Sequence, residues 1–278
     1  VYGLNPKYPG EGTPMTYYQW DSLIRTFFES KFYIPKDPNQ DHRYHLEPDW
    51  INRRGIYKDT FGSTQGWSDY QLRPNLCVAM TVAPELFDST HANGALDLVE
   101  QHLLGPLGMK TLDPSDLRYA PYYNNSNESD DYFTSKGMNY HQGPEWVWPL
   151  GYFMRARIQF CQHSSGLLKL KNSLYRILQK HEEYIKNSPW RGLPELTNKD
   201  AESCIFSCAT QAWSGATILD ALYDLRHKTV ATTTRPRKLS SVEEVSPGHS
   251  PRPSLTRSGG HPISRSPPIF KGLPEDVS

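Results

Sequence analysis

The sequence predicts an all-α fold followed by a disordered tail. Apolar residues recur at spacings of three and four over about six segments, and no strand-like alternation of any length competes with them. The residues after 225 lack an apolar period. Short and long loops alternate between the predicted helices, so the long loops would gather at one end of a helical toroid. The pattern alone does not choose a toroid over another helical array.

The first predicted helix begins near Thr16. In "YYQWDSLIRTFFESKF" one face collects five apolar side chains, which are Trp20, Leu23, Ile24, Phe27 and Phe28. Residues 1–14 are predicted to be extended chain broken by Pro and Gly, and residues 34–72 are predicted to be a loop. Helices resume at about 74–87 and 91–104, and Gly-Pro-Leu-Gly at 105–108 ends the second of them.

The second half begins with a long loop at 109–143, and long loops inside a compact domain are often functional. Helices are predicted at about 144–162, 167–186 and 208–225. The last has an apolar stripe made of Ala212, Ala216, Leu219, Leu222 and Tyr223. Residues 226–278 are dense in Ser, Pro, Thr and Arg and cannot bury enough surface to offset their ordering entropy. We therefore expect one domain at 1–225 and a disordered tail at 226–278.

Composition excludes several classes of protein. The 30 basic and 30 acidic residues balance, which gives no reason to expect a nucleic acid or an anionic membrane as partner. We expect a cytoplasmic protein, because no signal peptide, no membrane span and no disulfide spacing is evident. We expect no metal and no cofactor, since neither zinc-ligand spacing nor a phosphate-binding glycine loop occurs. The 17 Tyr and 7 Trp suit a carbohydrate site or an ordinary core.

Polar and aromatic residues cluster in the loops and at helix starts. Carboxylates flanked by Trp and Arg suit glycoside hydrolysis, in which one carboxylic acid protonates the leaving oxygen and a second carboxylate activates water or attacks. Pairs of this kind also occur as structural salt bridges and caps. Asp113 and Asp116 are interpreted as loop organisers.

These segments resemble a known family. "RGIYKDTFG", "DYQLRPN", "LLGPLGMKTLDP", "GMNYHQGPEWVWPLGYF", "SPWRGLPELTN" and "TQAWSGATIL" are similar, in order and spacing, to the C-terminal amylo-α-1,6-glucosidase region of eukaryotic glycogen debranching enzymes. The resemblance runs from about Thr16 to Leu225. It implies roughly the C-terminal half of an (α/α)6 toroid of the glucoamylase-like kind, with the active site among loops at one end.

The resemblance also implies a reaction and its residues. The expected activity is inverting hydrolysis of the α-1,6-linked glucose at glycogen branch stubs, coupled in full-length enzymes to 4-α-glucanotransferase activity. Glu195, in "GLPELTN", corresponds to the general base. The opening of a helix after Pro144 would place Glu145 in the wall of the glucose pocket; a purely structural helix cap and direct catalysis are the alternatives for this residue. The residues expected to bind substrate are Asp69, Arg73, His141, Gln142, Glu145, Trp146, Trp148, Trp190, Gln211 and Trp213.

The resemblance leaves one catalytic group unaccounted for. The family's general acid lies upstream of the matched region, so we expect this chain to be part of a longer protein and to be inactive alone. A partly built toroid would also expose apolar helix faces, so we expect the chain to be prone to aggregation. The alternative is a glycogen- or oligosaccharide-binding fragment without chemistry. A protein-docking tail and a related toroid hydrolase, such as a glucoamylase or trehalase, remain further alternatives.

Overall fold

The structure is a computed structural model that describes residues 15–161 and 164–228. Helices dominate this part of the chain, which confirms the all-α class. The expectations for residues 1–14 and for the tail from 229 onward lie outside the described residues. Within them, the last helix continues to His227, two residues beyond the predicted boundary.

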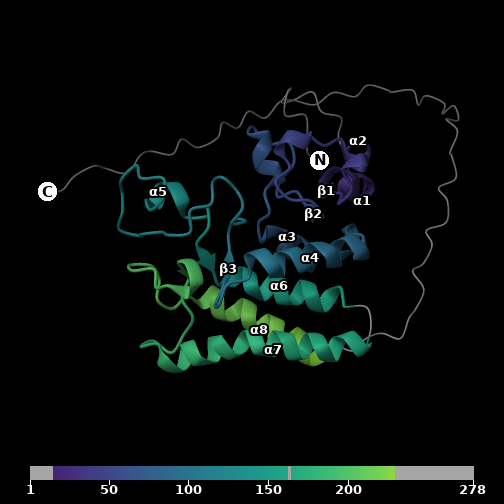
Figure 1. The fold of residues 1–278 in the computed structure, drawn as a ribbon. Coiled ribbons are helices and arrows are strands. Elements are labelled where there is room, and N and C mark those ends of the chain that lie inside the picture. The colour runs from purple at the N-terminus through teal and green to yellow at the C-terminus, as the bar shows by residue number, and fades with distance from the viewer. Residues whose placement is uncertain (1–14, 162–163, 229–278) are drawn as a thin grey trace, which may run out of the picture. The chain divides into compact units, whose positions relative to one another are not determined.

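Five long or medium helices form layers (Figure 1). These are α3 (Asn75–Val82), α4 (Ser89–Leu103), α6 (Trp148–Gln159), α7 (Ser164–Asn187) and α8 (Ala212–His227). Figure 1 shows α3 and α4 on one side of α6, with α7 and α8 on the other. Each of these helices lies within or close to a predicted one, but α6 and α8 begin about four residues later than predicted. The segment 74–87 is interrupted at Pro84, which lacks an N–H and begins a 3-10 turn, Pro84–Leu86.

The middle helix, α6, is buried around most of its circumference. Leu150, Phe153, Met154 and Ile158 are at most 2% exposed. Helix α8 crosses α6 closely at Gly151, where an added Cβ would lie 2.3 Å from the carbonyl oxygen of Thr217. Because the two backbones nearly touch here, this glycine sets the packing distance of the pair.

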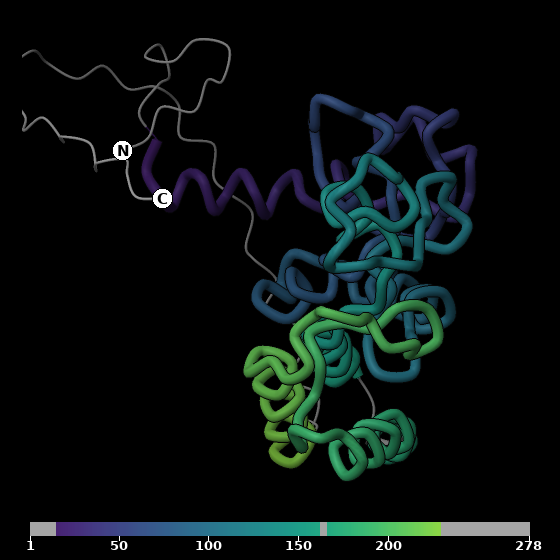
Figure 2. Tube along the Cα trace, turned by 90° about the vertical axis from the view of Figure 1, so that its left-hand side faces the viewer, coloured from purple at the N-terminus to yellow at the C-terminus, as the bar shows by residue number. Residues whose placement is uncertain are grey.

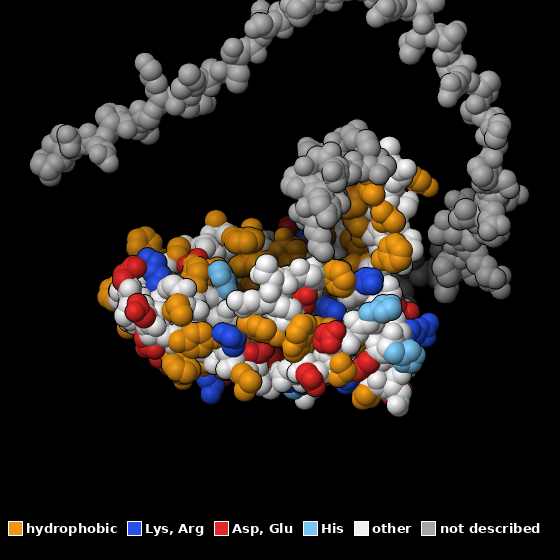
Figure 3. All heavy atoms as spheres, turned by 90° about the horizontal axis from the view of Figure 1, so that it is seen from above, with side chains coloured by type: hydrophobic (Ala, Val, Ile, Leu, Met, Phe, Trp, Pro, Cys, Tyr) orange, Lys and Arg blue, Asp and Glu red, His pale blue; other side chains and the backbone are white. Residues whose placement is uncertain are grey.

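Helix α1 (Tyr17–Phe32) begins with a capping box between Thr16 and Gln19 and has no fully buried residue. Phe28 and Phe32 pack against the core at its C-terminal end. Figure 2 shows the rest of α1 projecting from the other described elements, and Figure 3 shows hydrophobic side chains along it. The predicted apolar face is therefore present but largely uncovered: Trp20, Leu23, Ile24 and Phe27 are 39–50% exposed.

The predicted stripe of α8 is also turned outward. Leu219 and Tyr223 are 67% and 65% exposed. The face that packs on α6 consists instead of Ser214, Thr217, Ile218, Ala221 and Leu225. The apolar stripe is thus not the side that packs on α6. Small and hydroxyl side chains on the packing side allow the close approach at Gly151, which larger apolar ones would prevent.

Short strands were absent from the prediction. β1 (Tyr33–Ile34) pairs with β2 (Ile56–Tyr57), and β4 (Glu145–Trp146) lies between β3 (Met109–Lys110) and β5 (Leu196–Thr197), all antiparallel. Two-residue strands are too short to show alternation. The remaining short elements are α2 (Asp41–Tyr44), α5 (Lys136–Asn139) and the 3-10 turns Pro38–Gln40, Pro48–Trp50, Gly66–Tyr70 and Lys199–Ala201.

None of the helices in the described ranges is both long enough and apolar enough to cross a membrane.

Candidate active site

The three-stranded sheet joins the segments that contain most of the predicted site residues. Lys110, Glu145 and Thr197 lie side by side across β3, β4 and β5. One strand follows α4, one precedes α6 and one follows the loop with Glu195. The sheet therefore brings together segments that are more than 80 residues apart in sequence.

The loop with Glu195 is held at several backbone positions. The Glu195 N–H donates to the Cys208 carbonyl at 3.0 Å, and its carbonyl accepts from the Val147 N–H at 3.1 Å. The buried Ser214 hydroxyl, on α8, donates to the Pro194 carbonyl at 2.7 Å. These bonds connect the loop to the residue that precedes α6 and to α8, so the position of the carboxylate depends on the packing of α6 against α8.

The carboxylate of Glu195 is half-buried and faces a group of aromatic rings. The Tyr140 hydroxyl donates to Glu195 Oε1 at 2.8 Å. Tyr140 lies 4.8 Å from Tyr123 and 4.7 Å from Trp146, measured between ring centroids. Glu195 Oε2 accepts no hydrogen bond from any described residue, which leaves one carboxylate oxygen available to a water molecule or a substrate.

Glu145 lies in strand β4, so its predicted place at a helix N-terminus was wrong; α6 begins three residues later, at Trp148. The side chain is completely buried. Its two oxygens accept from the N–H groups of Asp200 and Ala201 at 3.1 and 3.2 Å. Lys110 Nζ is 3.9 Å away. Burial raises the pKa of Glu145, although the two N–H donors and Lys110 oppose that effect.

The loop that surrounds Glu145 has an unusual backbone. Asp200 and Ala201 both have positive φ, 59° and 64°. Their two N–H groups converge on one concavity, and converging backbone N–H groups favour an anion. The Glu145 carboxylate fills the concavity, and it ties the segment after β5 to β4.

Arg73 connects three segments of the site. Its guanidinium donates to the Gln142 side chain at 2.8 Å and to the His141 carbonyl at 2.6 Å. It also donates to the Thr111 carbonyl and the Gln71 side chain. Because these acceptors lie on both sides of the long loop, Arg73 holds the loop end next to Tyr140.

His141 is exposed and stacks on Trp146 at 4.9 Å between ring centroids. Desolvation by its neighbours and the Arg73 guanidinium lower the pKa of His141, while Glu195 opposes that change. The neutral imidazole is consequently the dominant form at pH 7. Trp146 is almost buried, and its indole N–H donates to the Tyr140 carbonyl.

Asp69 lies apart from this group and organises a turn. It is 5% exposed. It accepts from the Thr60 hydroxyl at 2.5 Å and from the Gly62 N–H at 2.8 Å. Burial would raise the pKa of Asp69, but these donors outweigh it and lower the pKa. The Asp69 carboxylate is thus hydrogen-bonded to the loop at 60–63.

Three of the four remaining predicted residues lie at the start of α6 or of α8, and the fourth, Trp190, follows α7. Trp148 and Trp213 stack in parallel, 4.4 Å apart with an 8° angle between the rings. Gln211 precedes α8, and its N–H donates to the Leu193 carbonyl in the Glu195 loop. Trp190 is 74% exposed.

Sequence comparison identifies the family of this arrangement. A family profile described as amylo-alpha-1,6-glucosidase matches residues 5–220. The chain belongs to the amylo-alpha-1,6-glucosidase family. It is 49% identical over 226 residues to the glycogen debranching enzyme of Saccharomyces cerevisiae, an alignment that covers 77% of this chain and 15% of that protein. The chain thus spans about 15% of the length of this curated relative.

Two further polar residues of the candidate site, Tyr140 and Asn198, are absent from the set expected to act on or bind the substrate. Tyr140 contacts Glu195, although its place beside His141 in "YHQGPEW" could have suggested it. Asn198 is buried, accepts from the Tyr123 N–H and donates to the Tyr123 carbonyl. It thereby joins the long loop to the segment after β5, a contact over 75 residues that no local pattern contains.

Proposed function

We propose that this chain provides the general-base part of a glycogen-debranching site that hydrolyses α-1,6-linked glucose with inversion. Glu195 is the base. The observation that supports this role most directly is the arrangement of its carboxylate, with Oε1 held by Tyr140 and Oε2 open. Membership of the amylo-alpha-1,6-glucosidase family supports the same reaction.

The chemical step requires little movement of the base. Ionised Glu195 accepts a proton from water through Oε2, and that water attacks C1 of the terminal glucose from the face opposite the leaving oxygen. The second carboxylic acid, supplied from outside this chain, protonates the leaving oxygen of the branch residue. Without that acid the isolated chain loses a contribution of about 10²–10⁴-fold, so we expect negligible activity from it.

We divide the predicted binding residues into two groups by their surroundings. His141, Trp148, Trp190, Gln211 and Trp213 border the Glu195 loop or are exposed, and are assigned to contacts with the sugar. Asp69, Arg73, Gln142, Glu145 and Trp146 are engaged with other protein groups and are assigned to positioning. The substrate class is glycogen or a branched limit dextrin.

The described helices correspond, in this proposal, to about half of an (α/α)6 toroid, with residues 1–225 as one domain. The outward apolar faces of α1 and α8 support this arrangement, since each offers a surface for a further helix. The domain boundary near residue 225 and the separate tail remain part of the proposal.

A chimera tests the catalytic role. Residues 5–220 replace the matching segment of the yeast relative, and glucose release from a limit dextrin is measured. Glu195→Gln is expected to lower kcat by about 10³-fold. Glu202→Gln removes an exposed carboxylate seven residues away and should leave the rate within about two-fold.

A second measurement separates a base from a merely structural residue. In Glu195→Ala, added azide can attack C1 without a base, and the product is β-glucosyl azide. Activity retained by Glu195→Gln, or release of glucose with the α configuration, would refute the assignment.

A further inference from the structure

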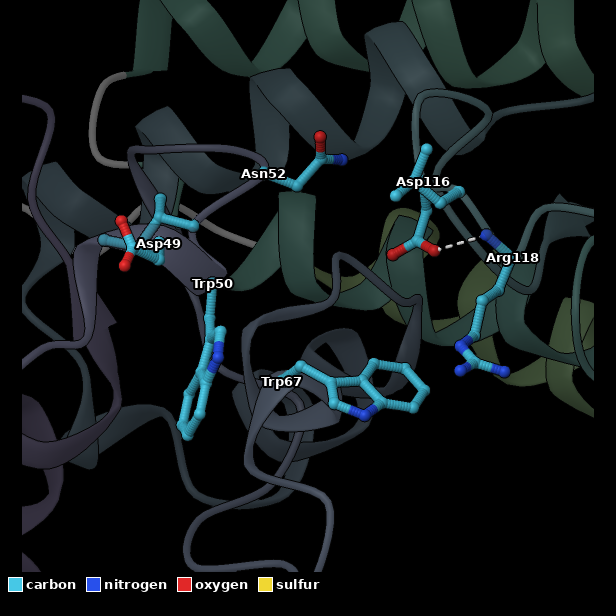
Figure 4. A pocket seen from close by; sticks show the side chains of 8 residues that line it. Asp49, Trp50, Asn52, Trp67, Asp116 and Arg118 are labelled. Carbon is cyan, nitrogen blue, oxygen red and sulfur yellow. Dashed lines mark hydrogen bonds between the residues drawn. The ribbon is translucent and has the colours of Figure 1, made fainter.

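A pocket outside the Glu195 site combines two indole rings with polar side chains (Figure 4). It has a volume of about 400 Å³ and is lined by Asp49, Trp50, Asn52, Trp67, Asp116 and Arg118. We call it the Trp50–Trp67 pocket. Three separate segments form it, namely the turns Pro48–Trp50 and Gly66–Tyr70 and the loop after β3.

Both rings are held by neighbouring residues. The Trp50 ring lies edge-on to Tyr70, with centroids 5.9 Å apart. It also lies against Gly66, where an added Cβ would be only 2.4 Å from Trp50 Cζ3. The Arg118 guanidinium lies 4.2 Å from the centre of the Trp67 ring. Trp50 nevertheless remains 45% exposed, so a fixed aromatic surface is presented to solvent.

Polar groups surround the two rings. Asp116 Oδ1 accepts from the Arg118 N–H at 2.8 Å, which fixes the loop (Figure 4). The Asp49 carboxylate, the Asn52 amide and the Arg118 guanidinium are on exposed residues. Flat apolar faces bordered by acceptors and donors match a sugar ring, whose C–H face is apolar and whose equatorial hydroxyls are polar.

The pocket is connected to the candidate active site through side chains. The Gln71 amide donates to Asp116 Oδ2 at 3.1 Å, and the same side chain accepts from Arg73 at 2.8 Å. Arg73 in turn binds Gln142 and the His141 carbonyl, adjacent to Tyr140. A continuous polar chain therefore runs from the pocket wall to the residue that holds Glu195.

We infer that the Trp50–Trp67 pocket binds a segment of α-1,4-linked glucan, as a subsite separate from the glucose at Glu195. The inference rests on the proposed function for the identity of the sugar. The pocket holds the chain that bears the branch, while the stub reaches Glu195. Trp50 and Trp67 stack on the sugar faces, and Asp49, Asn52 and Arg118 bind the hydroxyls.

Binding of maltoheptaose to the full chain tests the inference. The seven tryptophan indole N–H resonances are followed by NMR and assigned by single Trp→Phe variants. The resonances of Trp50 and Trp67 are expected to shift on titration. The shifts are measured on the unmutated chain, so they depend neither on a substitution that could disturb folding nor on catalytic turnover. Shifts confined to Trp148, Trp190 or Trp213 would overturn the inference.

Affinity measurements give the second readout. Trp50→Ala and Trp67→Ala are each expected to weaken maltoheptaose about ten-fold, which corresponds to the loss of one stacked ring. Tyr175→Ala, on α7, is the control, since Tyr175 is exposed to a similar degree (49%) and lies outside the pocket. Unchanged affinity in both Trp variants would overturn the inference. So would shifts of the Trp50 and Trp67 resonances on addition of a proline-rich peptide but not of maltoheptaose.

Failure of this inference can be told apart from failure of the proposed function. In the chimera, the two Trp variants should raise KM for limit dextrin about ten-fold and leave hydrolysis of α-glucosyl fluoride unchanged. Glu195→Gln should abolish hydrolysis of both and leave maltoheptaose binding intact. Full glucosidase activity of the Glu195→Gln chimera, with maltoheptaose still bound at the pocket, would refute the Glu195 assignment alone.

Discussion

Asp113 illustrates how a single buried charge stabilises the loop on which the Trp50–Trp67 pocket depends. It is 1% exposed and forms an ion pair with Arg53 through two hydrogen bonds. Burial would raise the pKa of Asp113, but Arg53 and the Ser115 donors outweigh it and lower the pKa. A carboxylate with a lowered folded-state pKa contributes stability above its unfolded pKa, and this contribution is lost as the pH falls through the folded value.

Asp113→Asn should therefore lower the free energy of unfolding by about 3 kcal/mol at pH 7, because it leaves the Arg53 guanidinium without its partner. The deficit should shrink as the pH falls below about 4, because the Asp113 carboxyl becomes protonated first in the unfolded state and only at lower pH in the folded state. Urea unfolding of the variant and of the wild type at several pH values measures this difference in the free energy of unfolding. Asp130→Asn, at an exposed position, is the control. A deficit independent of pH would contradict the role of the ion pair.

Ionisation of Glu145 changes the stability of the fold in the direction opposite to that of Asp113. Its pKa is raised by burial, so its ionisation costs folding free energy as the pH rises from about 4 toward the folded value. Its two oxygens nevertheless satisfy the N–H groups of Asp200 and Ala201. An amide can accept from only one of them and turns its NH2 group toward the other.

Glu145→Gln is thus expected to destabilise the chain by about 1–3 kcal/mol near pH 5. The deficit should become smaller at pH 8, since only the wild type bears the ionisation cost. Denaturant unfolding at the two pH values provides the measurement, with the exposed Glu183→Gln as control. A larger deficit at pH 8 would show that the carboxylate is stabilised in its ionised form.

At the scale of elements, the contact of α6 with α8 determines where Glu195 lies. Glycine in a helix interior is usually destabilising by about 0.5–1 kcal/mol relative to alanine. Gly151 is an exception, because the Thr217 carbonyl occupies the place of its missing Cβ. Gly215, on α8, has no other residue within 4 Å of that place. The two glycines form a matched pair.

Gly151→Ala is expected to separate the helices and lower the free energy of unfolding by about 1–3 kcal/mol. Gly215→Ala should raise it by about 0.5–1 kcal/mol through helix propensity alone. Thermal unfolding of the two variants compares them directly. Equal effects would mean that the α6–α8 distance adjusts freely, and the Glu195 loop would then not depend on it.

At the scale of the whole molecule, two apolar faces remain open. α1 presents Trp20, Leu23, Ile24 and Phe27, and α8 presents Leu219 and Tyr223. Contiguous apolar surface of this kind favours association, whereas single exposed apolar residues do not. In the proposed half-toroid, these are the faces against which further helices pack.

The isolated chain is accordingly expected to self-associate. The double variant Trp20→Gln with Phe27→Gln should shift sedimentation toward the monomer, because it removes the two largest rings of the α1 face. Leu117→Gln changes a fully exposed leucine in a loop (102%) and should have no effect. Weak association becomes detectable at a protein concentration of roughly tens of micromolar. A wild-type chain that sediments as a monomer at that concentration would contradict this prediction.

Local sequence determined the helices of this protein. The three-and-four spacing in 17–32, 91–104 and 167–186, and the break at Gly105–Gly108, need only neighbouring residues to be recognised. The resemblance likewise singled out Glu195. These features could be predicted because helix periodicity, capping and chain breaks are short-range effects.

Only the tertiary structure decided which helix faces are covered and how the site is assembled. The outward stripe of α8, the burial of Glu145 and the contact of Tyr140 with Glu195 each depend on residues distant in sequence. Strands of two residues joined Lys110, Glu145 and Thr197 without any local signal. The physical reason is that packing and long-range hydrogen bonds depend on which segments meet, and apolar periodicity marks a face without specifying its partner.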